Sequence, residues 1–232
     1  YIPIKKDFFI YIYYVLYKII AFIKRKKSNP LYSIFVSKRY ARYLEKQDFS
    51  DVDILFVPAM SPYIAFFNTE LPIIYLTDST FSLYCDYYPS MKNLLSKNKK
   101  EGLILDSLVY QKASGIICSS DWAFKSIVND FHIDPSKVCV AEFGPNIDMA
   151  LKQKVDWKKH SKLNLLFIGV DWKRKGGDVA VSACKALIYM NIDAVLHVVG
   201  CEIPSKYKSL KFIKGYGFLS KNIKEDLVFI LF

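Results

Sequence analysis

The feature that most constrains this chain of 232 residues is residues 163–178, which read Leu-Asn-Leu-Leu-Phe-Ile-Gly-Val-Asp-Trp-Lys-Arg-Lys-Gly-Gly-Asp. An apolar run ends at Gly169, a loop with three cations follows, and residues 179–190 have helical character. A second apolar run, residues 194–200, comes next. This order of strand, loop, helix and strand predicts a βαβ unit and therefore a parallel sheet.

The loop contains the residue types that bind a diphosphate. Gly176 and Gly177 let the backbone approach a ligand closely, and a helix start offers free N–H groups and a positive dipole end. Arg174 and Lys175 add full positive charge, and arginine can hold phosphate through two parallel hydrogen bonds. A solvated basic turn would have the same composition, so both interpretations stay open. The spacing fits neither a dinucleotide fingerprint nor a P-loop.

The segment Phe-Ile-Gly-Val-Asp-Trp-Lys-Arg-Lys-Gly-Gly-Asp resembles the start of the nucleotide-sugar-binding domain of family 4 glycosyltransferases. These are retaining enzymes with two Rossmann-like α/β domains that face each other across a cleft, the GT-B fold. The resemblance implies that Arg174 and Lys175 are catalytic, because they would neutralise the donor diphosphate as it leaves. Many members carry an arginine directly after the first glycine. This chain has Val170 there, so Arg174 would have to supply the second cation.

The same resemblance implies the residues that bind the donor. Glu202 would meet a sugar or ribose hydroxyl, although a solvated carboxylate at the rim fits equally well. The segments Ser-Ser-Asp-Trp at 119–122 and Phe-Gly-x-Asn at 143–146 are also similar to the family, and an ordinary Gly-Pro-Asn turn is the alternative for the second. The expected donor-binding set is Gly169, Trp172, Gly176, Gly177, Glu202, Gly217, Phe218, Gly144 and Asn146.

A polar cluster, Thr-Asp-Ser-Thr at 77–80, follows the apolar run at residues 71–76. Open α/β sheets place their ligands just beyond the carboxyl ends of the strands. In the resemblance this region belongs to the acceptor side, and Asp78 and Thr80 are the candidates that would hold acceptor hydroxyls. A helix cap followed by a turn is the alternative for Ser79 and Thr80.

The sequence predicts four regions. Residues 1–30 form a basic and apolar front segment, 31–148 an acceptor-side Rossmann-like domain, 149–162 a polar linker, and 163–232 a nucleotide-sugar-binding Rossmann-like domain. Within the first domain, residues 32–47 predict an amphipathic helix with Phe35, Tyr40 and Leu44 facing inward. Asp121 is the expected N-cap of a helix over residues 122–131.

The net charge of +11 is concentrated at the front of the chain, where residues 1–46 hold eleven cations against two acidic residues. We therefore expect no nucleic-acid partner. Residues 8–23 are strongly apolar but too short to span a membrane, and Lys18 interrupts them. Residues 5–27 would suit an anionic membrane surface, and a buried helix beneath a basic segment is the equal alternative.

Five scattered cysteines indicate reduced thiols, a cytoplasmic location that could be peripheral at the membrane, and no zinc site. We expect no cofactor and no metal. The family's glycine-rich loop would precede Tyr1 and its glutamate pair would follow Phe232, so we expect a truncated chain with weak or no turnover. The predicted function is transfer of a sugar from a nucleotide-diphosphate sugar to a hydroxyl of an unidentified sugar, lipid-linked sugar or protein acceptor. A non-catalytic remnant of the fold and a nucleotide-sugar epimerase remain as alternatives.

Overall fold

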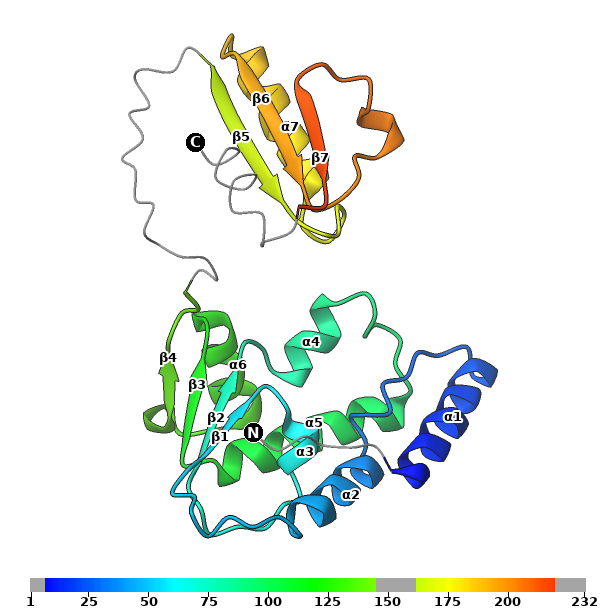
Figure 1. Ribbon diagram of the computed structural model, residues 1–232, viewed down its shortest axis with the longest axis vertical. Coiled ribbons are helices and arrows are strands. Elements are labelled where there is room, and N and C mark those ends of the chain that lie inside the picture. Colours follow the sequence, from blue (N-terminus) through cyan, green and yellow to red (C-terminus); the bar gives the residue numbers. More distant parts are fainter. Residues whose placement is uncertain (1–6, 145–161, 220–232) are drawn as a thin grey trace. The chain divides into compact units, whose positions relative to one another are not determined.

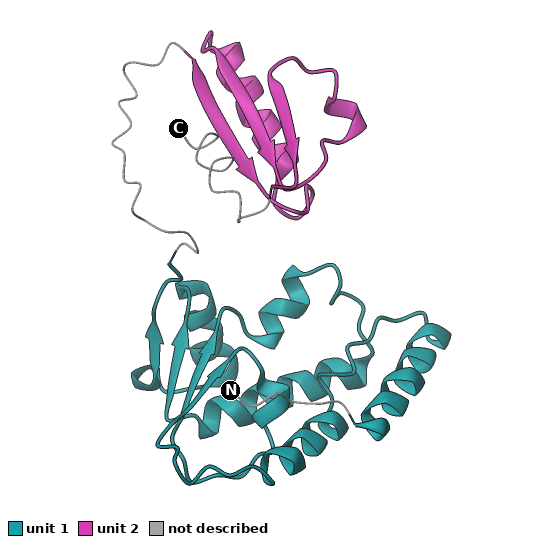
Figure 2. Ribbon diagram, viewed as in Figure 1, with its two compact units in different colours: residues 1–147 teal, residues 148–232 magenta. Residues whose placement is uncertain are grey.

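The computed structural model describes residues 7–144 and 162–219. The chain divides into two compact units, residues 1–147 and residues 148–232 (Figure 2). Unit 1 contains a four-stranded sheet with the order β1-β2-β3-β4, and unit 2 contains a three-stranded sheet with the order β5-β6-β7. Every pairing in both sheets is parallel, so each unit has the α/β architecture that the sequence predicts.

Parallel neighbours need long crossovers, and helices supply them in unit 1 (Figure 1). Its strands are β1 (Leu55–Pro58), β2 (Ile73–Thr77), β3 (Gly115–Cys118) and β4 (Val138–Val140). The helices that follow them are α3 (Ser61–Ile64), α4 (Phe81–Tyr87), α5 (Ser96–Lys112), α6 (Asp121–Phe131) and the 3₁₀ turn η1 (Pro135–Lys137).

The core of unit 1 lies between this sheet and the helices that cover it. Alternate residues of β2 and β3 are buried toward α5 and α6, and they are apolar except for Thr77 at the end of β2. Tyr75 of β2 packs edge-on against Tyr110 of α5, with ring centroids 5.7 Å apart. Gly102 of α5 leaves room for the Phe81 ring, because a Cβ at Gly102 would lie 2.3 Å from it.

The front of the chain packs onto the rest of unit 1 through α1 (Phe8–Ile23) and α2 (Ile34–Leu44). Tyr40 and Leu44 face inward as predicted, but the prediction for Phe35 is wrong. Phe35 is 40% exposed and stacks on Tyr13 of α1, because α2 turns that side toward α1 and not toward the sheet. Within the described residues, no helix has both the length and the apolar character to cross a bilayer.

The predicted N-cap of α6 is also wrong by one residue. Ser120 occupies the cap position with extended backbone, and its Oγ accepts the amide of Ala123 at 3.3 Å. Asp121 is the first residue of the helix, where its negative charge favours the dipole without closing the cap. The sequence offers three cap-forming residues in a row, so pattern alone does not fix the register.

Unit 2 is a βαβ unit followed by one more strand (Figure 1). The helix packs on one face of the sheet, and the core joins Phe167 and Leu196 of the strands to Val181 and Cys184 of the helix. Its elements are β5 (Leu163–Ile168), α7 (Gly177–Tyr189), β6 (Ala194–Val199), the 3₁₀ turn η3 (Ser205–Tyr207) and β7 (Ile213–Gly217).

Candidate functional site

Glycines lie at the carboxyl ends of all three strands of unit 2. Gly169 follows β5 and donates its amide to the carbonyl of Val199, and Gly200 follows β6 and donates to the carbonyl of Gly217, which ends β7. Gly200 and Gly217 have φ angles of +97° and +66°, which L side chains rarely adopt. A Cβ at Gly200 would also lie 3.0 Å from the carbonyl oxygen of Gly169. Gly169 is buried and Gly200 and Gly217 are half-buried, so these glycines pack the strand ends closely together at the edge where open α/β sheets place their ligands.

The side chain of Lys175 crosses this edge above Gly169. A Cβ at Gly169 would lie 2.8 Å from Cγ of Lys175, so only glycine leaves room for the lysine stem in this position. The backbone makes one helical turn between the strand and α7, because Lys175 donates its amide to the carbonyl of Asp171 at 3.0 Å. The predicted cation and the predicted glycine are thus brought together, and the exposed Lys175 is next to the end of β5.

The start of α7 is left without a side-chain cap. Gly176 holds the N-cap position in the left-handed region, with a φ of +81°. No side chain among the described residues accepts a hydrogen bond at this cap. The amide of Gly177 already donates to the carbonyl of Trp172 at 2.8 Å, and that of Val179 to the carbonyl of Gly176 at 2.9 Å. The positive end of the α7 dipole lies directly after the cations of the loop. This combination favours an anion.

Trp172 has a packing role in the core of unit 2. Its ring lies 5.4 Å from that of Phe167 and 5.8 Å from that of Tyr207, and its Nε1 donates to Asp178 at 3.2 Å. Only glycine fits at position 177, because a Cβ there would lie 2.3 Å from the indole. Contact of Trp172 with a donor stays a prediction, and the ring's indole N–H is already engaged.

Two carboxylates accompany the cations of the loop. The Oδ1 of Asp171 accepts the amide of Arg174 at 2.9 Å, which fixes the turn, and the Arg174 guanidinium lies 4.0 Å from the same carboxylate. The ammonium of Lys206, which donates to Asp178, lowers the pKa of that carboxyl to about 2, with help from Tyr207 and Trp172. Sequence reasoning missed Lys206, because it lies in η3, far along the chain from the loop that it contacts.

The remaining predicted donor residues divide into two groups. Glu202, Gly217 and Phe218 lie at or just past the ends of β6 and β7, at the same edge as Gly169, and Phe218 is 76% exposed. Gly144 belongs to unit 1, where it is exposed and a Cβ added to it would meet no described atom within 4 Å. Asn146 lies outside the described residues. Contact of any of these with a donor stays a prediction.

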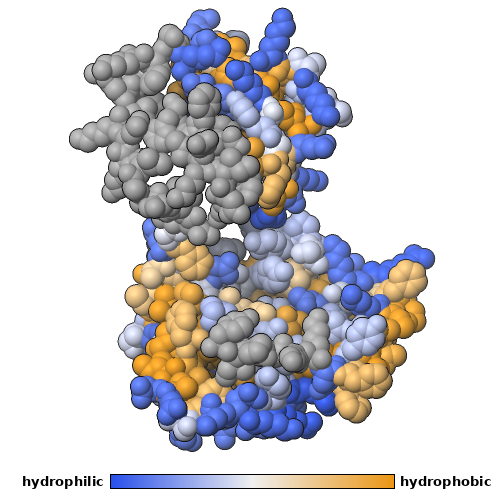
Figure 3. Space-filling model, in the orientation of Figure 1, coloured by the Kyte–Doolittle hydropathy of each residue, from blue (hydrophilic) through white to orange (hydrophobic). Residues whose placement is uncertain are grey.

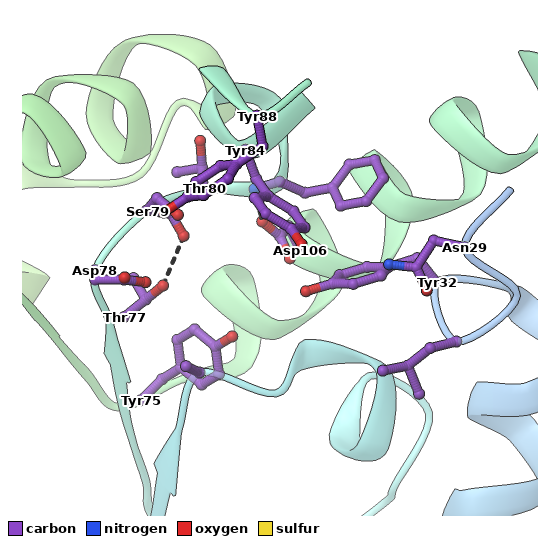
Figure 4. A pocket seen from close by; sticks show the side chains of 13 residues that line it. Asn29, Tyr32, Tyr75, Thr77, Asp78, Ser79, Thr80, Tyr84, Tyr88 and Asp106 are labelled. Atoms are coloured by element: carbon purple, nitrogen blue, oxygen red, sulfur yellow. Dashed lines mark hydrogen bonds between the residues drawn. The ribbon is translucent and has the colours of Figure 1, made fainter. Parts of the chain in front are cut away.

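Unit 1 contains a pocket of about 270 Å³ at the carboxyl ends of β1 and β2 (Figure 4). Ala59 follows β1, and Thr77 ends β2. Aromatic and small polar side chains form the wall, and Tyr32 and Tyr75 point toward its middle from different elements. The lining consists of Asn29, Leu31, Tyr32, Ala59, Tyr75, Thr77, Asp78, Ser79, Thr80, Phe81, Tyr84, Tyr88 and Asp106.

Asp106 of α5 is the buried charge of this pocket. Its carboxylate accepts hydrogen bonds from Ser61 Oγ at 2.5 Å, from the amide of Phe81 at 2.6 Å and from Tyr110 Oη at 3.0 Å. Burial raises the pKa of Asp106 to about 6, although these three donors oppose the rise. Burial also raises the pKa of Tyr75 and of Tyr32, so both phenols stay neutral at physiological pH.

Asn98 holds the opposite wall of the pocket in place. This fully buried side chain of α5 accepts the amide of Asn29 at 2.6 Å and donates to the carbonyls of Asn29 and Tyr32 at 3.0 and 2.9 Å. Sequence reasoning missed both Asn98 and Asp106. The available signal was a polar residue on the apolar side of a helix. The helical pattern of α5 contains such residues, but the pattern alone does not show that they are buried.

The two predicted acceptor residues line this pocket but differ in their surroundings. Asp78 is exposed just past the end of β2. The Oγ1 of Thr80 accepts the amide of Leu83 as the N-cap of α4 and shares a hydrogen bond of 2.8 Å with Ser126 Oγ. The Oγ1 of Thr77 donates to the carbonyl of Ser79, which fixes the loop between them (Figure 4). Contact of Asp78 or Thr80 with an acceptor stays a prediction.

Known proteins place this architecture in context. No protein-family model matches the sequence, and no curated protein matches it. Among solved structures, the glycosyltransferase TarM is similar over 80% of this chain and 36% of its own length, with a TM-score of 0.54 at 13% identity. A mutant of S. aureus TarM in complex with Fondaparinux, alpha-GlcNAc-glycerol and UDP is similar over 76% of this chain and 36% of its own, with a TM-score of 0.47 at 15% identity.

The likeness to TarM covers most of this chain but little more than a third of TarM. At this level of identity it shows the fold. The two parallel α/β units are Rossmann-like domains of the GT-B type, as the sequence predicts.

Proposed function

We propose that the chain is part of a glycosyltransferase that moves a sugar from a nucleotide-diphosphate sugar to an acceptor hydroxyl. One observation carries the proposal: Lys175 crosses Gly169 at the carboxyl edge of unit 2, beside the uncapped start of α7. An exposed cation beside the positive end of a helix dipole, at the carboxyl edge of a parallel sheet, is an arrangement that stabilises a diphosphate leaving group. Retention of the anomeric configuration belongs to the proposal through the resemblance to family 4 alone.

In this proposal, different residues of unit 2 contact different parts of the donor. Lys175 and Arg174 neutralise the diphosphate as negative charge develops on it. The backbone at Gly217 and the exposed ring of Phe218 meet the base, and Glu202 accepts a hydroxyl of the ribose or sugar. The phosphate itself can accept the acceptor proton, so no protein base and no metal are required.

The pocket of unit 1 is the proposed acceptor site. Its tyrosine rings offer flat apolar faces with polar tips, which suit a sugar or a polyol. Asp78 is the exposed carboxylate that would accept an acceptor hydroxyl, and the buried Thr80 would shape the wall beside it, because its hydroxyl is held by Leu83 and Ser126. A fixed site of neutral phenols and amide groups is suited to an uncharged carbohydrate, in contrast to the cationic edge of unit 2.

The test is calorimetric titration of UDP and GDP onto the whole chain. We expect one nucleoside diphosphate to bind, and Lys175→Gln to weaken it by roughly tenfold to a hundredfold, the loss of one charge-assisted hydrogen bond. The matched control is Lys162→Gln, which removes a cation at the amino end of β5, paired with Asp193 at 3.4 Å. It should leave the affinity unchanged.

Equal nucleotide affinity in Lys175→Gln and in the parent chain would contradict the proposal. So would a parent chain that binds neither UDP nor GDP. Incubation of the chain with the matching nucleotide sugar and a glycoside acceptor then separates the enzyme classes. A new glycoside indicates transfer, whereas a converted nucleotide sugar without acceptor product indicates an epimerase.

A further inference from the structure

Helix α1 is apolar on two opposite sides. Its inner side packs on the rest of unit 1 through Ile10, Tyr17 and Ala21, which are at most 5% exposed and recur at helical spacing. Its outer side consists of Phe8, Ile12, Val15, Ile19 and Ile23, which repeat at intervals of three and four residues. A helix that is hydrophobic all round is normally buried all round.

The outer side of α1 is instead open. The exposed fraction is 71% for Phe8, 50% for Ile19 and 72% for Ile23, and Phe22 beside them reaches 84%. Figure 3 shows hydrophobic residues gathered along this helix at the lower right. The helix is about 24 Å long at the usual rise per residue, so this stripe is a large apolar surface for something to cover.

A cluster of cations borders the end of the stripe. Lys24, Arg25, Lys26 and Lys27 follow the helix directly and are all exposed, and Lys18 lies at the stripe's edge. Helix α1 itself contains no acidic residue. Asp7, its N-cap, is paired with Arg39 at 2.5 Å.

The backbone holds this cluster in place. The amide of Lys27 donates to the carbonyl of Asn93, and the amide of Leu95 donates to the carbonyl of Lys27, so the two segments form a short bridge. Lys26 Nζ donates to Asn93 Oδ1 at 2.6 Å. The bridge brings Lys92, which is also exposed, to the same place, where it lines a second hollow of unit 1 with Lys26. The cations are therefore fixed at one end of the apolar stripe.

We propose that α1 lies in the surface of a membrane rich in anionic phospholipid, with its outer stripe among the acyl chains and the cation cluster at the headgroup phosphates. An apolar stripe bordered by cations is the charge and hydropathy pattern of interfacial helices. A second copy of this chain would bring cations of the same sign to the cluster and so offers no complementary charge. This inference is independent of the proposed glycosyl transfer.

The experiment is cosedimentation of the whole chain with vesicles of phosphatidylcholine alone or mixed with phosphatidylglycerol. We expect binding to the mixed vesicles, weakened by added salt because the headgroup contacts are ionic. The variant Ile12→Ser/Ile19→Ser should bind about tenfold or more weakly, since each loses apolar burial in the bilayer. Lys24→Gln/Arg25→Gln should lose the preference for phosphatidylglycerol.

The matched control is Tyr189→Ser/Met190→Ser, which removes two exposed apolar side chains from the end of α7 in unit 2 and should leave vesicle binding unchanged. Because the replaced side chains on α1 are exposed, circular dichroism and thermal unfolding should match the parent chain. Binding that is equal in Ile12→Ser/Ile19→Ser, or equal on both kinds of vesicle, would overturn the proposal. So would light scattering that finds a dimer which this variant dissociates, because the stripe would then cover a second copy.

Discussion

The two candidate sites of this protein differ in the residue types that form them and in how deeply their charges are buried. The pocket of unit 1 buries a carboxylate, Asp106, among donors that already hold it, and tyrosines surround it. The edge of unit 2 consists of closely packed glycines, and its cations, such as Lys175, lie outside in solvent. The pocket of unit 1 has its shape fixed before a ligand binds, whereas the edge of unit 2 supplies positive charge to a negatively charged ligand.

This difference determines whether a substitution at each site mainly affects stability or binding. Removing a polar group from unit 1 leaves its partners unsatisfied in the interior, so the main cost falls on stability. Removing a cation from unit 2 leaves an exposed loop intact, so the main cost falls on binding. Substituting a glycine there introduces a steric conflict.

The largest effect is expected for Asp106→Ala. It leaves Ser61 Oγ, the amide of Phe81 and Tyr110 Oη without their acceptor, which should cost unit 1 about 3–5 kcal/mol of unfolding free energy. Hydrogen exchange measured by mass spectrometry on peptides of α5 and β2 would detect the loss. The control Asp53→Ala removes an exposed carboxylate and should change stability by no more than about 0.5 kcal/mol. Equal effects would mean that the pocket does not depend on this network.

The pH dependence of stability should follow from the same carboxyl. Its pKa is about 6 in the folded chain against an ordinary value of 3.8, so the folded state binds the proton more tightly. The stabilisation is complete below pH 4 and is lost as pH rises through 6, a contribution of up to about 3 kcal/mol. Urea unfolding at pH 4, 5, 6 and 7 would measure it.

Asp106→Asn is the reference for this measurement, because it keeps the shape of the side chain and removes its titration. The parent chain should lose more stability than Asp106→Asn between pH 4 and pH 6. Glu101, whose pKa burial also raises, titrates in the same direction in both proteins and therefore cancels in the comparison. Parallel curves for the two proteins would refute the assignment.

The sequence predicted those parts of the fold that local pattern determines. The apolar runs at β2, β5 and β6 agree with the observed strands to within about two residues, because a buried parallel strand needs a continuous apolar run. The sequence placed Gly169 and Lys175 in one loop region, and the structure brings the two into contact, while their binding of a donor stays a prediction.

What the sequence did not predict depends on contacts between distant segments. Asp106 looks like any polar residue of a helix, and its burial arises only when α5 is covered by α3 and α4. Asn98 acquires its role because Asn29 and Tyr32, more than sixty residues earlier, lie against it. The helical spacing of α2 predicted that Phe35 faces inward. The pattern of α2 carries no information about α1, and α1 occupies that side of α2.

The smallest effect, and the sharpest test of unit 2, is expected for Gly177→Ala. The added Cβ would lie 2.3 Å from the Trp172 indole, so the ring must move away from Phe167 and from Asp178. Overpacking of this kind costs about 1–3 kcal/mol. Hydrogen exchange in peptides of β5 and α7 would register it.

The matched control is Gly144→Ala, where the new Cβ meets no described atom within 4 Å and no change is expected. If Trp172 serves only to pack the loop, a bound nucleoside diphosphate should restore part of the protection from hydrogen exchange that Gly177→Ala loses. The reason is that the ligand binds only the folded loop. If the ring itself contacts the donor, the displaced indole should weaken nucleotide binding beyond the loss of stability. Titration of both alanine variants with UDP therefore separates a glycine that supports the site from a tryptophan that belongs to it.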